Sequence, residues 1–292
     1  MSAWLEFTRE VFSSKKSLLS FTLAALSHYG IRASRKRGQN FSVSPRYLEA
    51  FYRKLVEWSP QAVLEVGTGI GALAYYVALR GREWQVVTIE NDRRIYSASV
   101  ELAGGLDNIA FVLADALEVI ETARFDTVFS STPYSITMPL LLGIVRNNSV
   151  KRSVLGVQRE VADRIVAEPG TRDYGRLTVA VALHFSVERL GDFRPQDFFP
   201  PPEVHTTLIA LERKREYSRT WGPLLEELTG CIFSSRNKRA KRVVACCLER
   251  LGVSEERART IAEESIRGEG MRARELSPQS IQEMLLKALS RG

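Results

Sequence analysis

Cysteine and histidine are scarce in this chain of 292 residues, with three of each. Cys246 and Cys247 are adjacent, Cys231 stands apart, and no pair has the C-x-x-C spacing of a zinc or redox motif. This odd, irregular set argues against a disulfide framework and for an intracellular, cytoplasmic protein. We assign Cys246 and Cys247 to core packing. The histidines are scattered, so no metal site is predicted.

Long apolar runs are also missing. The longest early stretch, residues 18–26, is interrupted by Ser20 and Thr22 and is far shorter than the ~20 residues that a membrane span needs. Acidic residues precede it and no small-residue cleavage pattern follows it, which argues against a secretory signal. We therefore expect residues 1–30 to form a helical extension packed on the following domain, and no association with a membrane.

Apolar segments and helix-length segments alternate through the first two thirds of the chain. The expected strands are residues 62–66, 85–90, 109–115, 125–130 and 152–158. Short buried strands separated in this way predict an α/β fold with a parallel, doubly wound sheet.

The pattern changes in the last third of the chain. Residues 187–213 read as extended segments around a stiff proline turn, and the last two segments are expected to close the sheet as an antiparallel pair. From about residue 216 the chain is charged and has only helical signals. We expect a domain over residues 1–213 and a small helical domain over residues 214–292.

A glycine-rich turn follows the first expected strand. Gly67, Gly69 and Gly71 lie between that strand and the next helix, where glycine allows a tight turn and a close approach of the backbone to a ligand. With Ala72 the same turn also fits the G-x-G-x-x-A motif of dinucleotide-binding proteins. A turn that serves only packing in an α/β protein could have the same sequence.

Two acidic residues help to decide between these interpretations of the glycine turn. Glu90 ends the second expected strand, where a carboxylate can accept both hydroxyls of a ribose, and Asp115 ends the third, where it can accept from an adenine amino group. Either acid alone is equally a solvated strand end or a helix cap. Both together, after the glycine turn, are typical of methyltransferases that bind S-adenosylmethionine.

The tetrad Ser131-Thr132-Pro133-Tyr134 follows the fourth expected strand and fits the pattern [Asp/Asn/Ser]-x-Pro-[Tyr/Phe/Trp] of enzymes that methylate exocyclic amines. An adenine amine is a poor nucleophile, so two acceptors aimed at its hydrogens favour the pyramidal form that attacks a methyl group. Pro133 would stiffen the loop, and Tyr134 would stack on an unstacked base. The alternative is a simple turn with Tyr134 as a core aromatic.

Further segments carry a family resemblance from about residue 28 to residue 245. They are GQNFSVSP (38–45), GVQREVADRI (156–165), YGRLTV (174–179), FFPPPEV (198–204) and FSSRNKRAKRVV (233–244). With the motifs above, the chain resembles the KsgA-type small-subunit ribosomal RNA adenine dimethyltransferases. Related enzymes of large-subunit RNA share the early motifs, but YGRLTV and the triple proline favour the small-subunit type.

The resemblance implies a Rossmann-like class I methyltransferase with a mostly parallel seven-stranded sheet and a small C-terminal helical domain. It implies S-adenosylmethionine as cofactor, small-subunit ribosomal RNA in the immature subunit as partner, and a monomer. A run of basic residues alone is more often a solvated helix face, but the resemblance favours RNA contacts. The expected RNA-binding residues are Arg35, Lys36, Arg37, Arg236, Lys238, Arg239, Lys241 and Arg242, with the last five on a helix.

Site roles also follow from the resemblance. The cofactor set is Asn40, Ser42, Gly67, Glu90, Asp115 and Ser131, with Asn40 and Ser42 at the methionine end. The catalytic set is Ser131, Pro133 and Tyr134. The target base is expected between Tyr134 and Phe198 or Phe199.

One departure from the family pattern concerns the chemistry. The family usually has asparagine where this chain has Ser131, and the change loses roughly one well-placed hydrogen bond, ~1 kcal/mol. We hypothesise that Ser131 slows turnover or favours one methyl over two. The alternative function is a weak or inactive RNA-binding assembly factor. A third alternative, a nicotinamide dehydrogenase, is remote. It lacks an identifiable proton donor near the cofactor, and it would leave the tetrad at residues 131–134 unexplained.

Overall fold

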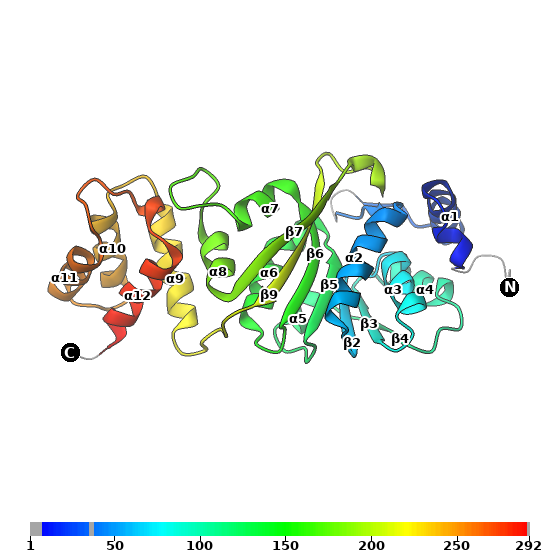
Figure 1. The fold of residues 1–292 in the computed structure, drawn as a ribbon, viewed down its shortest axis with the longest axis horizontal. Helices are drawn as coiled ribbons and strands as arrows, with labels where there is room; N and C mark the ends of the chain where they lie inside the picture. Colours follow the sequence, from blue (N-terminus) through cyan, green and yellow to red (C-terminus); the bar gives the residue numbers. More distant parts are fainter. Residues whose placement is uncertain (1–7, 35–37, 291–292) are drawn as a thin grey trace. The chain divides into compact units, whose positions relative to one another are not determined.

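The computed structural model describes residues 8–34 and 38–290, which form two compact units (Figure 1). The first unit comprises the described residues up to 159 together with residues 187–213, and the second comprises residues 160–186 and those from 214 onward. Each unit has a hydrophobic core of its own. None of the helices within the described ranges is long and apolar enough to cross a membrane.

The first unit is built on a seven-stranded sheet with the order β4-β3-β2-β5-β6-β9-β7. The strands are β2 (Ala62–Val66), β3 (Gln85–Glu90), β4 (Ile109–Leu113), β5 (Thr127–Ser131), β6 (Arg152–Gln158), β7 (Phe185–Phe193) and β9 (Thr206–Arg213). The neighbours from β4 to β6 are parallel, and β9 pairs antiparallel with β6. This confirms the predicted α/β class, and the strand order reverses between β2 and β5, which is where such sheets bind ligands.

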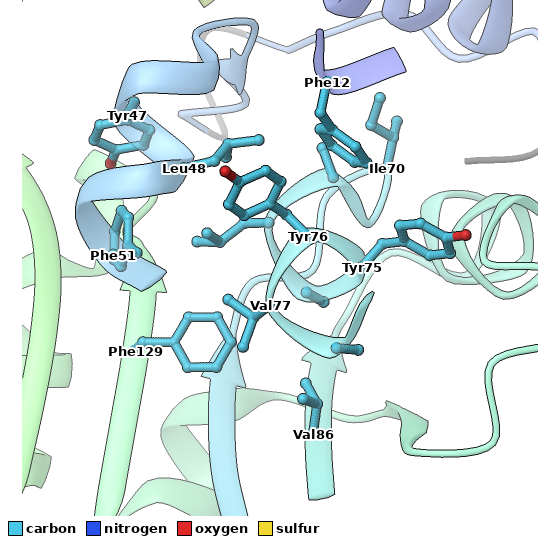
Figure 2. Packing of buried hydrophobic residues seen from close by; sticks show 14 of the residues in the cluster. Phe12, Tyr47, Leu48, Phe51, Ile70, Tyr75, Tyr76, Val77, Val86 and Phe129 are labelled. Carbon is cyan, nitrogen blue, oxygen red and sulfur yellow. The ribbon is translucent and has the colours of Figure 1, made fainter. Parts of the chain in front are cut away.

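Helices follow the strands of this unit, and their apolar faces form its core. They are α2 (Pro45–Trp58), α3 (Ala72–Arg80), α4 (Arg93–Leu102), α5 (Ala116–Ile120) and α6 (Thr137–Arg146). Figure 2 shows Phe51 of α2 and Val77 of α3 beside Phe129 of β5. Strands covered in this way carry apolar residues on both faces, which is why β2 reads as an apolar run that only Glu65 interrupts.

The N-terminal segment packs on the same core. It consists of a 3-10 helix (Arg9–Phe12) and α1 (Lys15–His28), and Ser14 caps α1 by accepting a hydrogen bond from the Ser17 N–H at 3.0 Å. The Phe12 ring lies with its centroid 5.1 Å from that of Tyr76 (Figure 2). Among the described residues, this segment is therefore helical and packed on the core of the first unit.

The second unit is helical. Its helices are α7 (Arg159–Ile165), α8 (Arg176–His184), α9 (Gly222–Ser234), α10 (Ala240–Arg250), α11 (Glu255–Ser265) and α12 (Pro278–Leu289). The expected division at residue 213 differs from this one, because residues 160–186 lie with the C-terminal helices. Tyr174 is fully buried there and its hydroxyl donates to the Leu276 carbonyl at 2.6 Å. The boundary between the two units is therefore set by contacts between residues about a hundred positions apart in sequence.

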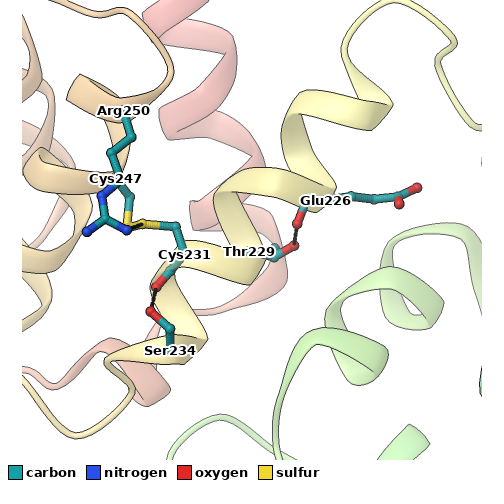
Figure 3. Close-up of a disulfide and its surroundings, with 6 residues drawn as sticks. All are labelled: Glu226, Thr229, Cys231, Ser234, Cys247 and Arg250. Carbon is teal, nitrogen blue, oxygen red and sulfur yellow. Dashed lines mark hydrogen bonds between the residues drawn. A yellow bond between two sulfur atoms is a disulfide. The ribbon is translucent and has the colours of Figure 1, made fainter.

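A disulfide joins two helices of the second unit and corrects the prediction from cysteine content. Cys231 of α9 is bonded to Cys247 of α10, with their Cα atoms 5.7 Å apart (Figure 3). Cys246, which we assigned to the core, is exposed. Adjacent residues of a helix point about 100° apart, so only one of the pair can face α9. Cysteine content thus lends no support to an intracellular location, which stays a prediction.

Candidate functional site

A cavity of about 680 Å³ opens where β2, β3, β4 and β5 end, beside the reversal of strand order. This volume is within the range of pockets that hold small molecules and cofactors. The predicted residues that line it are Asn40, Ser42, Gly67, Glu90, Asp115, Ser131 and Pro133. They come from five separate segments. Four of these lie where parallel strands end at one edge of the sheet, and the fifth is the segment of Asn40 and Ser42, which lies outside that sheet.

The glycine turn (residues 67–71) forms the floor of the cavity. The Gly67 and Thr68 N–H groups both donate to the Ile89 carbonyl, at 2.9 and 3.1 Å, which ties the turn to β3. Gly67 has a φ of +80°, and a Cβ atom there would lie 3.4 Å from Cδ of Pro133. Glycine therefore allows both the turn and the close approach of Pro133.

The carboxylate of Glu90 is fixed by three backbone donors. Its oxygens accept hydrogen bonds from the N–H groups of Gly69 at 3.0 Å, Asn91 at 3.1 Å and Asp92 at 3.0 Å. Burial nevertheless raises the pKa of Glu90, which is 8% exposed, because desolvation outweighs these donors. The carboxylate is thus rigid and faces the cavity as an acceptor.

Asp115 has two roles at once. One of its oxygens accepts from the Leu117 N–H at 2.8 Å and so caps α5, which was the alternative that sequence left open. The side chain is also exposed and lines the cavity. A capping aspartate uses part of its acceptor capacity, so the remainder is available to a ligand.

Glu65 is a cavity residue that sequence analysis did not single out. It is 1% exposed, and the Thr88 hydroxyl and the Ala74 backbone N–H donate to its carboxyl group. Burial raises its pKa to about 8. The available signal was an acid inside an apolar strand, which is costly unless polar partners surround it.

The segment around Asn40 reaches the cavity from far away in sequence. Its side-chain amide and its backbone N–H both donate to the Gly38 carbonyl, at 3.3 and 3.0 Å. Gly38 has a φ of +66°, and a Cβ atom there would lie 2.9 Å from the Tyr134 nitrogen, so this segment packs directly on the loop after β5. Ser42 ends β1 (Phe41–Ser42) and is buried at the cavity wall.

The proline loop (residues 131–134) turns toward the cavity. Ser131 is half-buried at its edge, and Pro133 covers Gly67. Tyr134 is not among the lining residues, although Pro133 and Ser135 are, and its hydroxyl shares a hydrogen bond of 2.8 Å with the Thr206 hydroxyl. Tyr134 is half-buried, so it is neither a core aromatic nor an open platform.

Comparison with known proteins identifies the family. The profile of the ribosomal RNA adenine dimethylases matches residues 30–285. The chain belongs to the ribosomal RNA adenine dimethylase family. Members methylate adenine in ribosomal RNA with S-adenosylmethionine, so this chain is an S-adenosylmethionine-dependent methyltransferase.

Individual relatives agree with this assignment. The chain is 36% identical to a probable ribosomal RNA small subunit methyltransferase A of Aeropyrum pernix, over 70% of this chain and 73% of the relative. It is 33% identical to the protein of the same description from Methanopyrus kandleri, over 82% and 85%.

Solved structures show the same fold. A dimethyladenosine transferase of Plasmodium falciparum superposes with a TM-score of 0.66 at 22% identity, covering 84% of this chain and 96% of that one. The 23S rRNA methyltransferase ErmE superposes with a TM-score of 0.60 at 24% identity, covering 85% and 99%.

The cavity of this dimethylase fits its cofactor. S-adenosylmethionine carries ribose hydroxyls and an adenine amine that need acceptors, and the fixed carboxylate of Glu90 and the exposed one of Asp115 are acceptors of the kind that would hold them. The uncovered backbone of the glycine turn leaves room for a ligand against β2.

The two phenylalanines expected opposite the target base do not line the cofactor cavity of the dimethylase. Phe198 is 5% exposed, and its ring contacts Tyr47 in the core. Phe199 is half-buried, pairs with Phe41 between β8 (Phe198–Phe199) and β1, and lines a second, shallower hollow with Pro200. A place for either ring beside the target base stays a prediction.

The basic segment of the second unit is only partly helical, which corrects the prediction that all its cations share a helix. Residues 235–239 form a turn, and only Lys241 and Arg242 lie on α10. The turn is held by backbone bonds to the loop at residues 271–274, such as the Ala273 N–H to the Lys238 carbonyl at 3.0 Å. Arg35, Lys36 and Arg37 lie outside the described residues.

The cations of this segment also differ in what they contact. The guanidinium of Arg236 is half-buried and donates to the carbonyls of Thr171 and Arg172, at 3.0 and 2.8 Å. Lys238, Arg239 and Arg242 are exposed. The guanidinium of Arg236 is therefore engaged within its own unit, while the exposed cations remain candidates for RNA phosphates.

Proposed function

We propose that this enzyme dimethylates two adjacent adenines near the 3′ end of small-subunit ribosomal RNA, within the immature small ribosomal subunit. The names of the relatives from Aeropyrum pernix and Methanopyrus kandleri support the small subunit as target. The observation that carries the proposal is the contact of Pro133 with Gly67, which brings the proline loop onto the cofactor cavity. A monomer in the cytoplasm, where ribosomal subunits mature, completes the proposal.

The chemistry assigned to the loop is one of orientation. An adenine amine has its lone pair delocalised into the ring, so acceptors that bind both N–H groups favour the pyramidal nitrogen that can attack. The Ser131 hydroxyl and a backbone carbonyl of the loop would accept these hydrogens, and Pro133 fixes their geometry. The bound cofactor supplies the methyl group on its sulfonium. No general base is needed, because the amine loses a proton readily once it carries the new methyl.

The target base has to leave its stack to reach this loop. Tyr134 lies beside the cavity and offers a half-buried ring, which supports a role in holding the base by stacking. Stacking on an aromatic ring is worth ~1–3 kcal/mol per base, enough to offset much of the unstacking cost.

Mapping modified adenines by mass spectrometry tests the proposal. Immature small subunits that lack the modification are incubated with the enzyme and S-adenosylmethionine, and the positions and numbers of methyl groups are read from RNA fragments. We expect two dimethyladenines near the 3′ end. Cofactor binding without any methylated product would instead favour the inactive assembly factor.

The same assay tests the serine hypothesis. Wild type is compared with Ser131→Asn, the residue usual in the family, and with Ser131→Ala. We expect Ser131→Ala to lower turnover at least tenfold, and Ser131 to give more monomethyl product than an asparagine at that position. Equal product distributions for Ser131 and Ser131→Asn would remove the hypothesis that serine limits the second transfer.

A further inference from the structure

A buried tyrosine lies directly behind Ser131. Tyr47 comes from α2, is 0% exposed, and its hydroxyl oxygen is 3.1 Å from Oγ of Ser131 (Figure 2 shows the tyrosine on its helix). The two residues are separated by 84 positions in sequence. The hydrogen bond therefore joins α2 to the end of β5, at the edge of the cofactor cavity.

The ring of Tyr47 is held on several sides. Its centroid lies 5.1 Å from that of Phe51, 4.8 Å from that of Phe193 and 5.0 Å from that of Phe198, each time edge to face. Burial raises the pKa of the Tyr47 hydroxyl, so the phenol stays protonated. A ring fixed in this way holds its hydroxyl at one place.

Gly156 provides the space for that hydroxyl. It faces Ser131 across the pairing of β5 with β6, and a Cβ atom on it would lie 1.8 Å from the Tyr47 oxygen. No residue with a side chain fits at this position while the tyrosine stays in place. Tyr47, Ser131 and Gly156 thus form one arrangement, in which the space at Gly156 lets the phenol reach Ser131.

We propose that Tyr47 is a positioning residue for methyl transfer, which fixes the Ser131 hydroxyl so that its oxygen faces the target amine. The inference rests on the role proposed for Ser131. A serine hydroxyl rotates among three positions, whereas the amide of the usual asparagine is planar and directional. One hydrogen bond from a rigid phenol selects one of these positions. Whichever hydroxyl donates, Oγ keeps a lone pair for an amine N–H.

A double-mutant cycle tests the coupling. Tyr47→Phe, Ser131→Ala and the double variant are compared with wild type in the full-length enzyme, with kcat and the KM for S-adenosylmethionine measured separately. We expect Tyr47→Phe to lower kcat ~5-fold, as for the loss of one hydrogen bond, with KM changed less than twofold. In the Ser131→Ala background the same change should have no further effect. An equal loss in both backgrounds would overturn the proposal, as would an unchanged kcat for Tyr47→Phe.

A matched control separates positioning from a general effect of losing a phenol. The Tyr52 hydroxyl donates to the Arg80 carbonyl at 3.1 Å and lies outside the cavity. Tyr52→Phe should therefore leave kcat unchanged. Thermal midpoints of both variants are measured, so that a loss of activity through unfolding is recognised.

A crystal structure of Tyr47→Phe gives a readout that does not depend on turnover. We expect Ser131 to occupy more than one rotamer in the variant and a single one in wild type. A single, unchanged rotamer in the variant would refute the positioning role even in an active enzyme. If wild type makes no methyladenine while the rotamer does change, the proposed function fails and the support of Ser131 by Tyr47 stands.

Discussion

Replacing Glu65 with glutamine is expected to change how the stability of the first unit depends on pH. Burial raises the pKa of the Glu65 carboxyl from its ordinary value of 4.5 to about 8. Below pH 4.5 the folded and unfolded chains both hold this proton. Between 4.5 and about 8 the unfolded chain releases it while the folded chain keeps it, so the free energy of unfolding falls as pH rises. Above about pH 8 the folded carboxyl ionises as well and the decline ends.

The size of this effect follows from the shift in pKa. Each unit corresponds to ~1.4 kcal/mol, so the buried carboxyl removes on the order of 5 kcal/mol of stability across the window. Glutamine has the same shape, can accept from the Thr88 hydroxyl through its carbonyl and does not titrate. The free energy of unfolding of the Glu65→Gln variant, relative to that of wild type, should therefore increase steadily as pH rises.

The assay is denaturant-dependent hydrogen exchange of the peptide that covers β2, measured at several pH values between about 5 and 8, so that the first unit alone reports. Taking the difference between wild type and variant removes the pH dependence that other groups contribute. Glu83→Gln, at an exposed position of the same unit, is the matched control. A difference between wild type and Glu65→Gln that stays constant across the series would refute the argument from burial.

Further predictions concern the cofactor, the RNA and the disulfide. Glu90→Gln should weaken S-adenosylmethionine binding at least tenfold by calorimetry, because an amide nitrogen then faces backbone N–H donors; an unchanged Kd would contradict the assigned contact. The double variant of Lys238 and Arg242 to glutamine should weaken RNA binding and reduce the salt dependence of log Kd by about 2, and an unchanged slope would exclude phosphate contacts. Cys231→Ser should lower the stability of the second unit by up to ~3 kcal/mol in denaturant melts, as for a loop of this length, and a reductant should mimic it in wild type but not in the variant.

The residues of the cofactor cavity that lie along the sheet edge could be predicted because each is recognised from its position at the end of a strand. Gly67 and Asp115 follow short strands and Glu90 ends one, and parallel strands bring their carboxyl ends to one edge. Their meeting could thus be predicted without knowing the packing of any helix. Even so, Asp115 both caps α5 and lines the cavity. The helix cap and the ligand acceptor, which the sequence offered as alternatives, therefore occur in the same residue.

The surroundings of side chains outside these motifs could not be read from the sequence. Phe198 fits an aromatic wall by its place in the motif, yet its ring is buried in the core against Tyr47. Arg236 reads as one of a run of surface cations, yet it donates to two carbonyls of its own unit. In both cases the direction of the side chain, which composition and spacing do not encode, decided its role.

The sequence by itself determined where the parallel strands lie along the chain, the edge of the sheet where the cofactor residues gather and the family to which the chain belongs. These features rest on periodicity and on residues close to one another along the chain. Only the tertiary structure decided which residues support Ser131, which cysteines pair and where residues 160–186 pack. Those contacts join positions far apart in sequence, and they exist only once side-chain volumes, as at Gly156 against Tyr47, have been fitted together.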